Sequence, residues 1–296
     1  MNIKGISGNA TSGKFSIETL CLLLITCLML SLDFNKELQW YSGFGIILLG
    51  LISVGIPHGA VDYLLETGKW NSQSSPLFIL NYLLKGAAMG MAWYFIPQLA
   101  IIFFIGYSAW HFGQTDGVHW NFKSWESNLW GAWILLFILG THGTETNDIL
   151  SSMGNKIKFP DFPWYGMLPW LIYSAIKKNY NHLLTIFWIS LTSQLPLIFA
   201  FGLYFIGQHS WISWNHIKIR LQLTHKNIWF KSLPFHAGGW LLLVLFLKFW
   251  STRFDTHPSQ MWGTFFIFVG CISFPHVISM NKMYIKMFQG IANQNT

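Results

Sequence analysis

The sequence predicts an all-α membrane protein, a polytopic bundle of about eight transmembrane helices. Hydrophobic residues make up 52% of its 296 residues and charged residues only 10%, whereas a soluble domain carries roughly 25% charged residues. The apolar runs are long enough to cross about 30 Å of hydrocarbon as helices, and they lack the period-two alternation of strands. Because only helices or closed barrels satisfy the backbone in lipid, these runs favour helices.

We expect the transmembrane helices at residues 16–32, 40–57, 76–96, 98–112, 125–142, 183–210, 233–250 and 261–280. Residues 162–176 are also apolar, but their two prolines, Trp and Tyr favour a position at the membrane interface. A single transmembrane catalytic domain is expected over residues 16–288. Residues 1–15 and 289–296 are expected to be a disordered N-terminus and a C-terminal tail.

The net charge of +7 does not indicate a nucleic-acid partner. Lys and Arg lie in the connections between apolar runs, and cytoplasmic loops of membrane proteins carry an excess of these residues. With eight spans, the connection that holds Lys218, Arg220, Lys226 and Lys231 lies on the same side as both termini. This bias predicts a multi-pass protein of the cell's inner membrane with its histidine-bearing face toward the cytoplasm.

Four of the eleven histidines end alternate apolar runs. They are His58, His111, His209 and His276, at the ends of the second, fourth, sixth and eighth runs. With eight spans all four emerge on the same face of the membrane. Polar groups at membrane depth are costly and usually functional, and neutral imidazole is a common ligand of iron, zinc or copper. The pattern therefore predicts a shared metal site.

Two of these histidines are followed by an acidic residue. In Gly-Ile-Pro-His58-Gly-Ala-Val-Asp62, a continuing helix would place Asp62 on the face of His58, where its carboxylate can orient an imidazole. Trp-His111-Phe-Gly-Gln-Thr-Asp116 has its acid five positions on. The alternative for both motifs is an ordinary histidine at the headgroup level, with Asp62 capping the helix.

The fourth imidazole is less well defined. Two ligands on one helix normally lie three or four residues apart, but His209 and His216 are seven apart, about 10.5 Å along an ideal helix. His216 is therefore a weaker candidate than His209, and His276 competes with it. The remaining histidines are expected to be structural or exposed: His142 and His236 at helix ends, and His119, His182, His225 and His257 in solvent.

Four motifs resemble those of a known family. They are Pro-His58-Gly-Ala-x-Asp62, Trp-His111-Phe-Gly with the following Asp116, Tyr-Phe-x-x-x-His209-Ser, and the terminal Pro-His276. In this order, from residue 55 to 280, they resemble the Brp/Blh family of bacterial and archaeal β-carotene 15,15′-dioxygenases.

The resemblance implies a membrane-embedded, non-haem Fe²⁺ enzyme. It would cleave the central double bond of all-trans-β-carotene with O₂ into two all-trans-retinals, with a functional link to a microbial rhodopsin. The family's essential histidines carry over to His58, His111 and His209. Its fourth belongs to a His-Ser-x-x-His pattern, where this chain has Ser213; His216 is the first choice for that ligand and His276 the second. On this hypothesis Asp62 and Asp116 orient ligands, and no catalytic residue is expected beyond the metal site.

Three other functions compete with this hypothesis. Membrane desaturases and hydroxylases, which act on lipids, resemble one another by His-x-x-x-His and His-x-x-His-His boxes, and this chain has neither. A carotenoid or retinal carrier would explain 17 Trp, 26 Phe and 10 Tyr, but not histidines on one face. A transporter is disfavoured because, apart from Lys85, the expected spans hold almost no charge.

Overall fold

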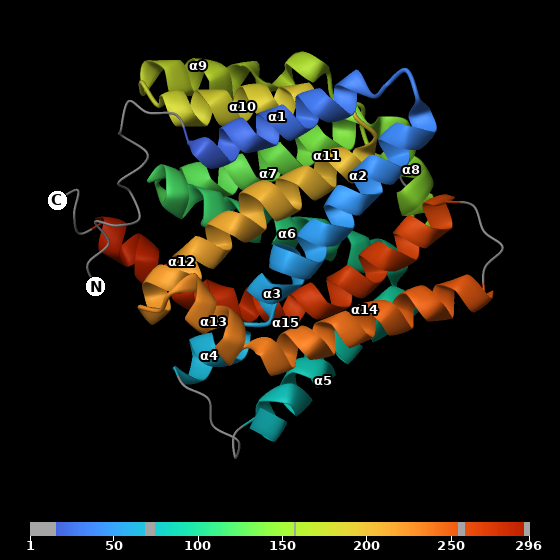
Figure 1. Cartoon of the computed structure of the whole chain (residues 1–296), viewed down its shortest axis with the longest axis vertical. Coiled ribbons are helices and arrows are strands. Elements are labelled where there is room, and N and C mark those ends of the chain that lie inside the picture. Colours follow the sequence, from blue (N-terminus) through green and yellow to red (C-terminus); the bar gives the residue numbers. More distant parts are fainter. Residues whose placement is uncertain (1–15, 69–74, 157, 254–257, 293–296) are drawn as a thin grey trace.

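The computed structural model describes residues 16–68, 75–156, 158–253 and 258–292 (Figure 1). Within these residues all regular structure is helical and there is no strand, which confirms the all-α fold class. The α-helices are α1 (Ile17–Ser31), α2 (Lys36–Gly50), α3 (Ile56–Gly59), α4 (Asp62–Thr67), α5 (Ser75–Phe95), α6 (Pro97–Trp120), α7 (Ser124–Thr141), α8 (Gly143–Ser152), α9 (Leu168–Ile176), α10 (Tyr180–Thr192), α11 (Leu197–Leu203), α12 (Trp211–Leu221), α13 (His225–Lys231), α14 (Leu233–Arg253) and α15 (Pro258–Ala292). Two π-helices, η2 (Leu51–Gly55) and η4 (Tyr204–Ser210), and the 3₁₀-helix η3 (Trp164–Met167) complete the described elements.

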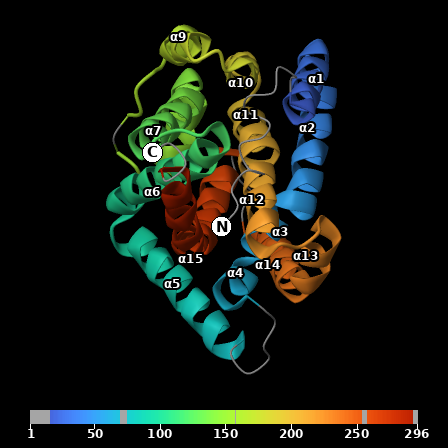
Figure 2. The ribbon, with the colours of Figure 1, turned by 90° about the vertical axis from the view of Figure 1, so that its left-hand side faces the viewer.

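The long helix α15 organises the fold. It packs against α5, α6, α8 and α4, and Figure 2 shows it between α5 and α6 on one side and α12 and α14 on the other. One large apolar core fills the space between α6, α7, α10 and α11. A second, smaller core joins α4 and α12 to the C-terminal half of α15.

Helices α6 and α7 approach each other more closely than ordinary side chains allow. A Cβ atom at Gly131 would collide with the Ala109 carbonyl oxygen, and one at Gly113 would collide with that of Ser127. One turn further along α6, a Cβ at Gly117 would meet the Ser127 hydroxyl. Small residues four apart permit this kind of backbone contact between helices. The contact fixes the turn of α6 that follows His111.

A proline interrupts the hydrogen bonds of α15 where two neighbouring helices bond its backbone. Pro275 has no N–H with which to bond the carbonyl of Cys271, four residues earlier. On either side of that carbonyl, the Tyr107 hydroxyl donates to the Gly270 oxygen at 2.8 Å and the Tyr82 hydroxyl to the Ile272 oxygen at 3.0 Å. Hydroxyls from α6 and α5 thus anchor α15 immediately before His276.

By length and composition, two described stretches can cross a membrane: Lys36–Thr67 and Ser259–Gln289. A third is added if His225–Lys231 and Leu233–Leu245, bent by 65°, form one span. The eight-span arrangement therefore stays a prediction. The expected span 183–210 is wrong as a single helix, because the turn at Ser193–Pro196 divides it into α10 and α11.

Two expected boundaries also differ. The run expected over 98–112 continues as helix to Trp120, because its polar second half packs inside the protein. Helix α15 continues to Ala292, beyond residue 288 where a tail was expected. Residues 1–15 and 293–296 of the expected termini lie outside the described residues.

The close α6–α7 contact leads to a stability prediction. Gly131→Ala places a methyl group against backbone atoms, so the helices must separate, at a cost of about 1–3 kcal/mol. Gly106→Ala on α6 is the matched control, since no atom lies within 4 Å of its Cβ position. Thermal unfolding of the detergent-solubilised protein should show a lower midpoint for Gly131→Ala alone. Equal midpoints for the two variants would refute the close contact.

Candidate functional site

Four imidazoles from four helical elements lie together inside the fold. His58 comes from α3, His111 from α6, His209 from η4 and His276 from α15. The ring centroids of His58 and His276 are 4.9 Å apart, those of His276 and His111 5.3 Å, those of His111 and His209 4.8 Å, and those of His209 and His58 5.7 Å. Each residue is at most 4% exposed. These four histidines form the histidine cluster.

The two π-helices position half of the cluster. Segment η2 directly precedes the α3 turn that holds His58, and η4 contains His209. The two segments pack against each other, and a Cβ at Gly50, the last residue of α2 before η2, would lie 2.7 Å from the Ile206 side chain. A π-turn fits one extra residue into the helix, which shifts the direction of every side chain beyond it, and such turns are frequent at functional sites.

Asp62 orients an imidazole of the cluster, but that imidazole belongs to His276. The Nδ1 of His276 donates to the two carboxylate oxygens at 2.9 and 3.0 Å, and both residues are buried. The expected partner, His58, instead donates from its Nδ1 to the Gly55 carbonyl at 2.5 Å. The helix stops at Gly59 and two turn residues follow, so the four-residue spacing does not put Asp62 on the face of His58.

Asp116 bonds no imidazole in the described structure. Its carboxylate accepts hydrogen bonds from the Trp130 indole at 2.7 Å and from the Tyr204 hydroxyl at 3.0 Å. Five residues correspond to about 140° of rotation around a helix, so Asp116 faces away from His111. The carboxylate therefore ties α6 to α7 and to η4, and thereby fixes the helices that carry His111 and His209.

His216, the first choice for the fourth ligand, lies apart from the cluster. The ring contacts described for it are with Tyr284, at a centroid distance of 5.8 Å, and with His119, at 6.4 Å. The structure instead groups His276, the second choice, with the other three. Sequence reasoning missed Tyr284, whose ring lies 6.2 Å from that of His111. Its eight-residue spacing from His276, about two helical turns, was the available signal.

Several ring nitrogens of the cluster have no hydrogen-bond partner. They are both nitrogens of His111, Nδ1 of His209 and Nε2 of His276. An unpaired buried polar group costs roughly 1–3 kcal/mol, and a cation bound to the lone pairs would remove part of that cost. Asp62 binds the Nδ1 side of His276, so Nε2 is the ring nitrogen left to face a metal.

The spacing of the rings suits a metal, although their nitrogens do not converge. Imidazoles that hold an ion tetrahedrally at about 2.1 Å place neighbouring ring centroids about 5 Å apart, close to the separations in the cluster. However, no three His, Cys, Asp or Glu side chains among the described residues are arranged to hold a metal ion as they stand. Metal binding at the cluster would therefore require its rings to turn.

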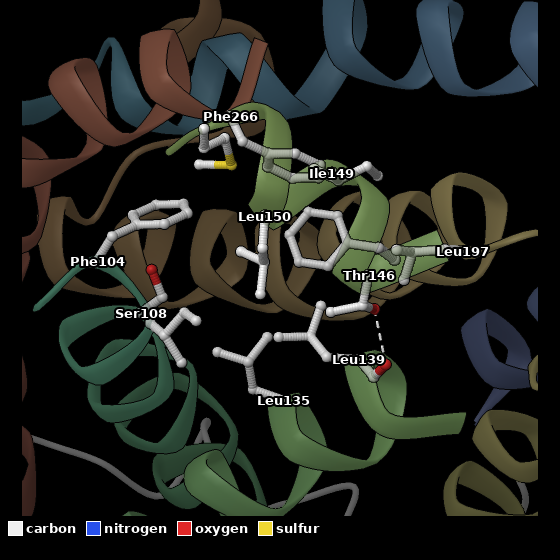
Figure 3. Close-up of a pocket in the computed structure, with 12 residues that line it drawn as sticks. Phe104, Ser108, Leu135, Leu139, Thr146, Ile149, Leu150, Leu197 and Phe266 are labelled. Atoms are coloured by element: carbon white, nitrogen blue, oxygen red, sulfur yellow. Dashed lines mark hydrogen bonds between the residues drawn. The ribbon is translucent and has the colours of Figure 1, made fainter. Parts of the chain in front are cut away.

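A row of phenylalanines leads away from the cluster. Phe205 stacks on His209 and on Phe201, with both centroid distances 5.9 Å, and Phe201 contacts Phe266 at 5.4 Å. Phe201 and Phe266 line an apolar cavity of about 50 Å³ between α6, α7, α8, α11 and α15 (Figure 3). Aromatic surface thus connects the histidine cluster to an apolar cavity.

The other histidines are partly as expected. His225 is exposed, as predicted, and His119 is half-buried. The expectation for His182 is wrong: it is fully buried, bonds the Ser174 hydroxyl at 2.6 Å and packs among aromatic rings. His142 and His236 are buried and hydrogen-bonded at helix ends. His257 lies outside the described residues.

Comparison with known proteins identifies the family. A family model described as β-carotene 15,15′-dioxygenase matches residues 49–284. The match covers most of the chain and includes the whole histidine cluster. Neither the curated proteins nor the solved structures include a significant match. The chain belongs to the β-carotene 15,15′-dioxygenase family.

Proposed function

We propose that this protein is a membrane-embedded, iron-dependent dioxygenase that converts all-trans-β-carotene and O₂ into two molecules of all-trans-retinal. The observation that carries the proposal is the cluster of buried imidazoles with unpaired ring nitrogens in a chain of this family. Cleavage breaks one C=C bond and gives each carbon one oxygen atom. O₂ is reduced as the polyene is oxidised, so no further reductant is needed.

The proposed iron ligands are His58, His111, His209 and His276. Neutral imidazole suits Fe²⁺, and a four-histidine set leaves coordination positions free and places no carboxylate on the metal. Bound there, iron would supply the activation of O₂. Asp62 acts through His276, because its hydrogen bonds fix the proton on Nδ1 and the orientation of the ring.

Aromatic surface is the proposed means of holding the substrate. β-Carotene has no polar group by which a protein can fix it, so binding depends on shape and apolar contact. Phe112, whose ring centroid is 4.5 Å from that of His209, and the Phe205–Phe201 pair offer this surface. The cavity beyond them is smaller than a carotenoid end group, so the side chains that line it must move to admit one.

A membrane location would let the protein take such a substrate directly from lipid. Its support is the pair of helical stretches able to cross a membrane and the apolar surface of α5, where Leu77, Leu80, Leu83 and Leu84 are each more than half exposed. Large exposed apolar surfaces mark membrane or protein contacts. We place the protein in the inner membrane with the cluster toward the cytoplasm, where it would supply retinal to a microbial rhodopsin.

Substitution of each cluster histidine should abolish cleavage. In a bacterium that makes β-carotene, expression of the protein should replace the carotenoid with retinal on chromatography. The β-carotene should remain uncleaved when any one cluster histidine is replaced, because each replacement removes a proposed iron ligand. The four variants are His58→Ala, His111→Ala, His209→Ala and His276→Ala. Gly106→Ala, which touches nothing, should cleave normally. Retinal formation by His276→Ala, together with its loss in His216→Ala, would overturn our choice of the fourth ligand.

Removal of iron should stop the reaction reversibly. The purified protein should contain one iron atom per chain by mass spectrometry and lose it with its activity on chelation. Addition of Fe²⁺ should restore the bound iron and the activity, whereas Zn²⁺, which has no redox chemistry, should not restore the activity. Undiminished retinal formation by metal-free protein would refute the iron-dependent reaction. Carotenoid binding without cleavage by the iron-loaded protein would instead favour a carrier.

Loss of the Asp62 carboxylate should weaken metal binding rather than folding. Asp62→Asn should bind Fe²⁺ about 10–100-fold more weakly, as removal of a ligand-orienting carboxylate typically does, and excess Fe²⁺ should rescue its activity. Asp116→Ala removes the oxygen that accepts from both Trp130 and Tyr204, so its thermal midpoint should fall more than its metal affinity. Metal titration and thermal unfolding of both variants distinguish the two roles. The reverse pattern would refute them.

A further inference from the structure

The histidine cluster has no direct contact with water. Its residues are at most 4% exposed and are surrounded by apolar side chains. A metal ion must nevertheless reach it, and a cation is strongly disfavoured in hydrocarbon or in an apolar protein interior. A site of this kind therefore needs a polar route from the surface. This inference rests on the proposed function, because it concerns the metal proposed to bind at the cluster.

A second, larger cavity is lined by residues that neighbour the cluster in the chain and through Tyr284, although no cluster histidine lines it. It has a volume of about 440 Å³ and is enclosed by the start of α1, the end of α6, α10, η4 and α12. Polar side chains contribute much of its lining: Glu18, His119, Asn181, Gln208, Asn215 and His216. Gln208, in this lining, directly precedes His209 in η4.

Groups able to hold a metal follow one another along this cavity. The Glu18 carboxylate is exposed and lines the cavity together with His119. The rings of His119 and His216 have centroids 6.4 Å apart. Beyond them, Nδ1 of His216 lies 3.3 Å from the Tyr284 hydroxyl, and the Tyr284 ring neighbours that of His111 in the cluster. The series runs from the exposed surface to a cluster histidine.

Both imidazoles of the series can accept a cation at neutral pH. Burial lowers the pKa of His119 to about 4 and that of His216 to about 3, so each keeps an unprotonated nitrogen. Both lie beyond the ends of the expected membrane spans. The cavity also contains a repelling charge, Lys218, whose ammonium group is 3.1 Å from Nε2 of His225. A cation is therefore favoured beside Glu18 and His119 rather than beside Lys218.

We propose that this cavity is the route by which the metal ion reaches the histidine cluster from water, with Glu18, His119 and His216 as successive transient ligands. The assignment gives His216 a function although it lies outside the cluster. It also separates two properties of the site: the cluster sets the equilibrium affinity, and the cavity sets the rate of loading.

The test measures metal loading without measuring catalysis. Metal-free, full-length protein in detergent is mixed with Co²⁺, and its visible absorption bands are followed with time. Glu18→Gln, His119→Ala and His216→Ala should each slow loading roughly tenfold or more, equivalent to at least 1.4 kcal/mol in the barrier, with unchanged final stoichiometry and equilibrium affinity. Glu37→Gln is the matched control for Glu18→Gln, because it neutralises an exposed carboxylate on α2 that does not line the cavity, and it should load at the unaltered rate.

Each alternative result has a distinct meaning. Loading of all three variants at the unaltered rate would overturn the route and leave the proposed function intact. A weaker equilibrium affinity in His216→Ala would make His216 a ligand of the final site and would also overturn the route. If the unsubstituted protein bound no Co²⁺ or Fe²⁺, the proposed function would fail. Glu18→Gln keeps the test decisive if a buried variant misfolds, because Glu18 is exposed.

Discussion

Burial of four imidazoles against one another is the constraint on which the rest of the structure depends. Such rings need hydrogen-bond partners, and the fold provides only some of them: the Gly55 carbonyl for His58 and the Asp62 carboxylate for His276. His111 has no partner on either nitrogen. Each unpaired group opposes folding by roughly 1–3 kcal/mol, so other contacts must hold the rings together until a ligand binds.

Those contacts are distributed over the helices that carry the rings. The glycine contact between α6 and α7 fixes His111, and Asp116 joins the same helices to η4 through Trp130 and Tyr204. Asp62 connects α4 to α15 through His276. One turn further along both helices, Glu66 accepts a hydrogen bond from Ser279 at 2.9 Å. Because the links come from different helices, a change in one helix need not release the whole cluster.

The sequence was sufficient for the helical fold and for three members of the cluster. His58, His111 and His209 end apolar runs, which pointed to a shared face, although the eight-span arrangement behind that argument stays a prediction. His276 was only an alternative, because distance along the chain favoured His216 and the packing of α15 is a long-range property. The partner of Asp62 was also out of reach, since the break after Gly59 has no clear local signal. His182 was misplaced because its surroundings are polar in sequence but aromatic in space.

The π-helix η4 has a consequence for how distances along this chain are counted. Its extra residue is equivalent to a one-residue insertion that the helix has absorbed without breaking. Residues on either side of such an insertion no longer share the angular phase of an ordinary α-helix. Two chains can therefore present a histidine at the same point in space from positions that differ by one in an alignment. For this helix, homologous positions are better defined by which side chain faces α6 than by the number of residues between histidines.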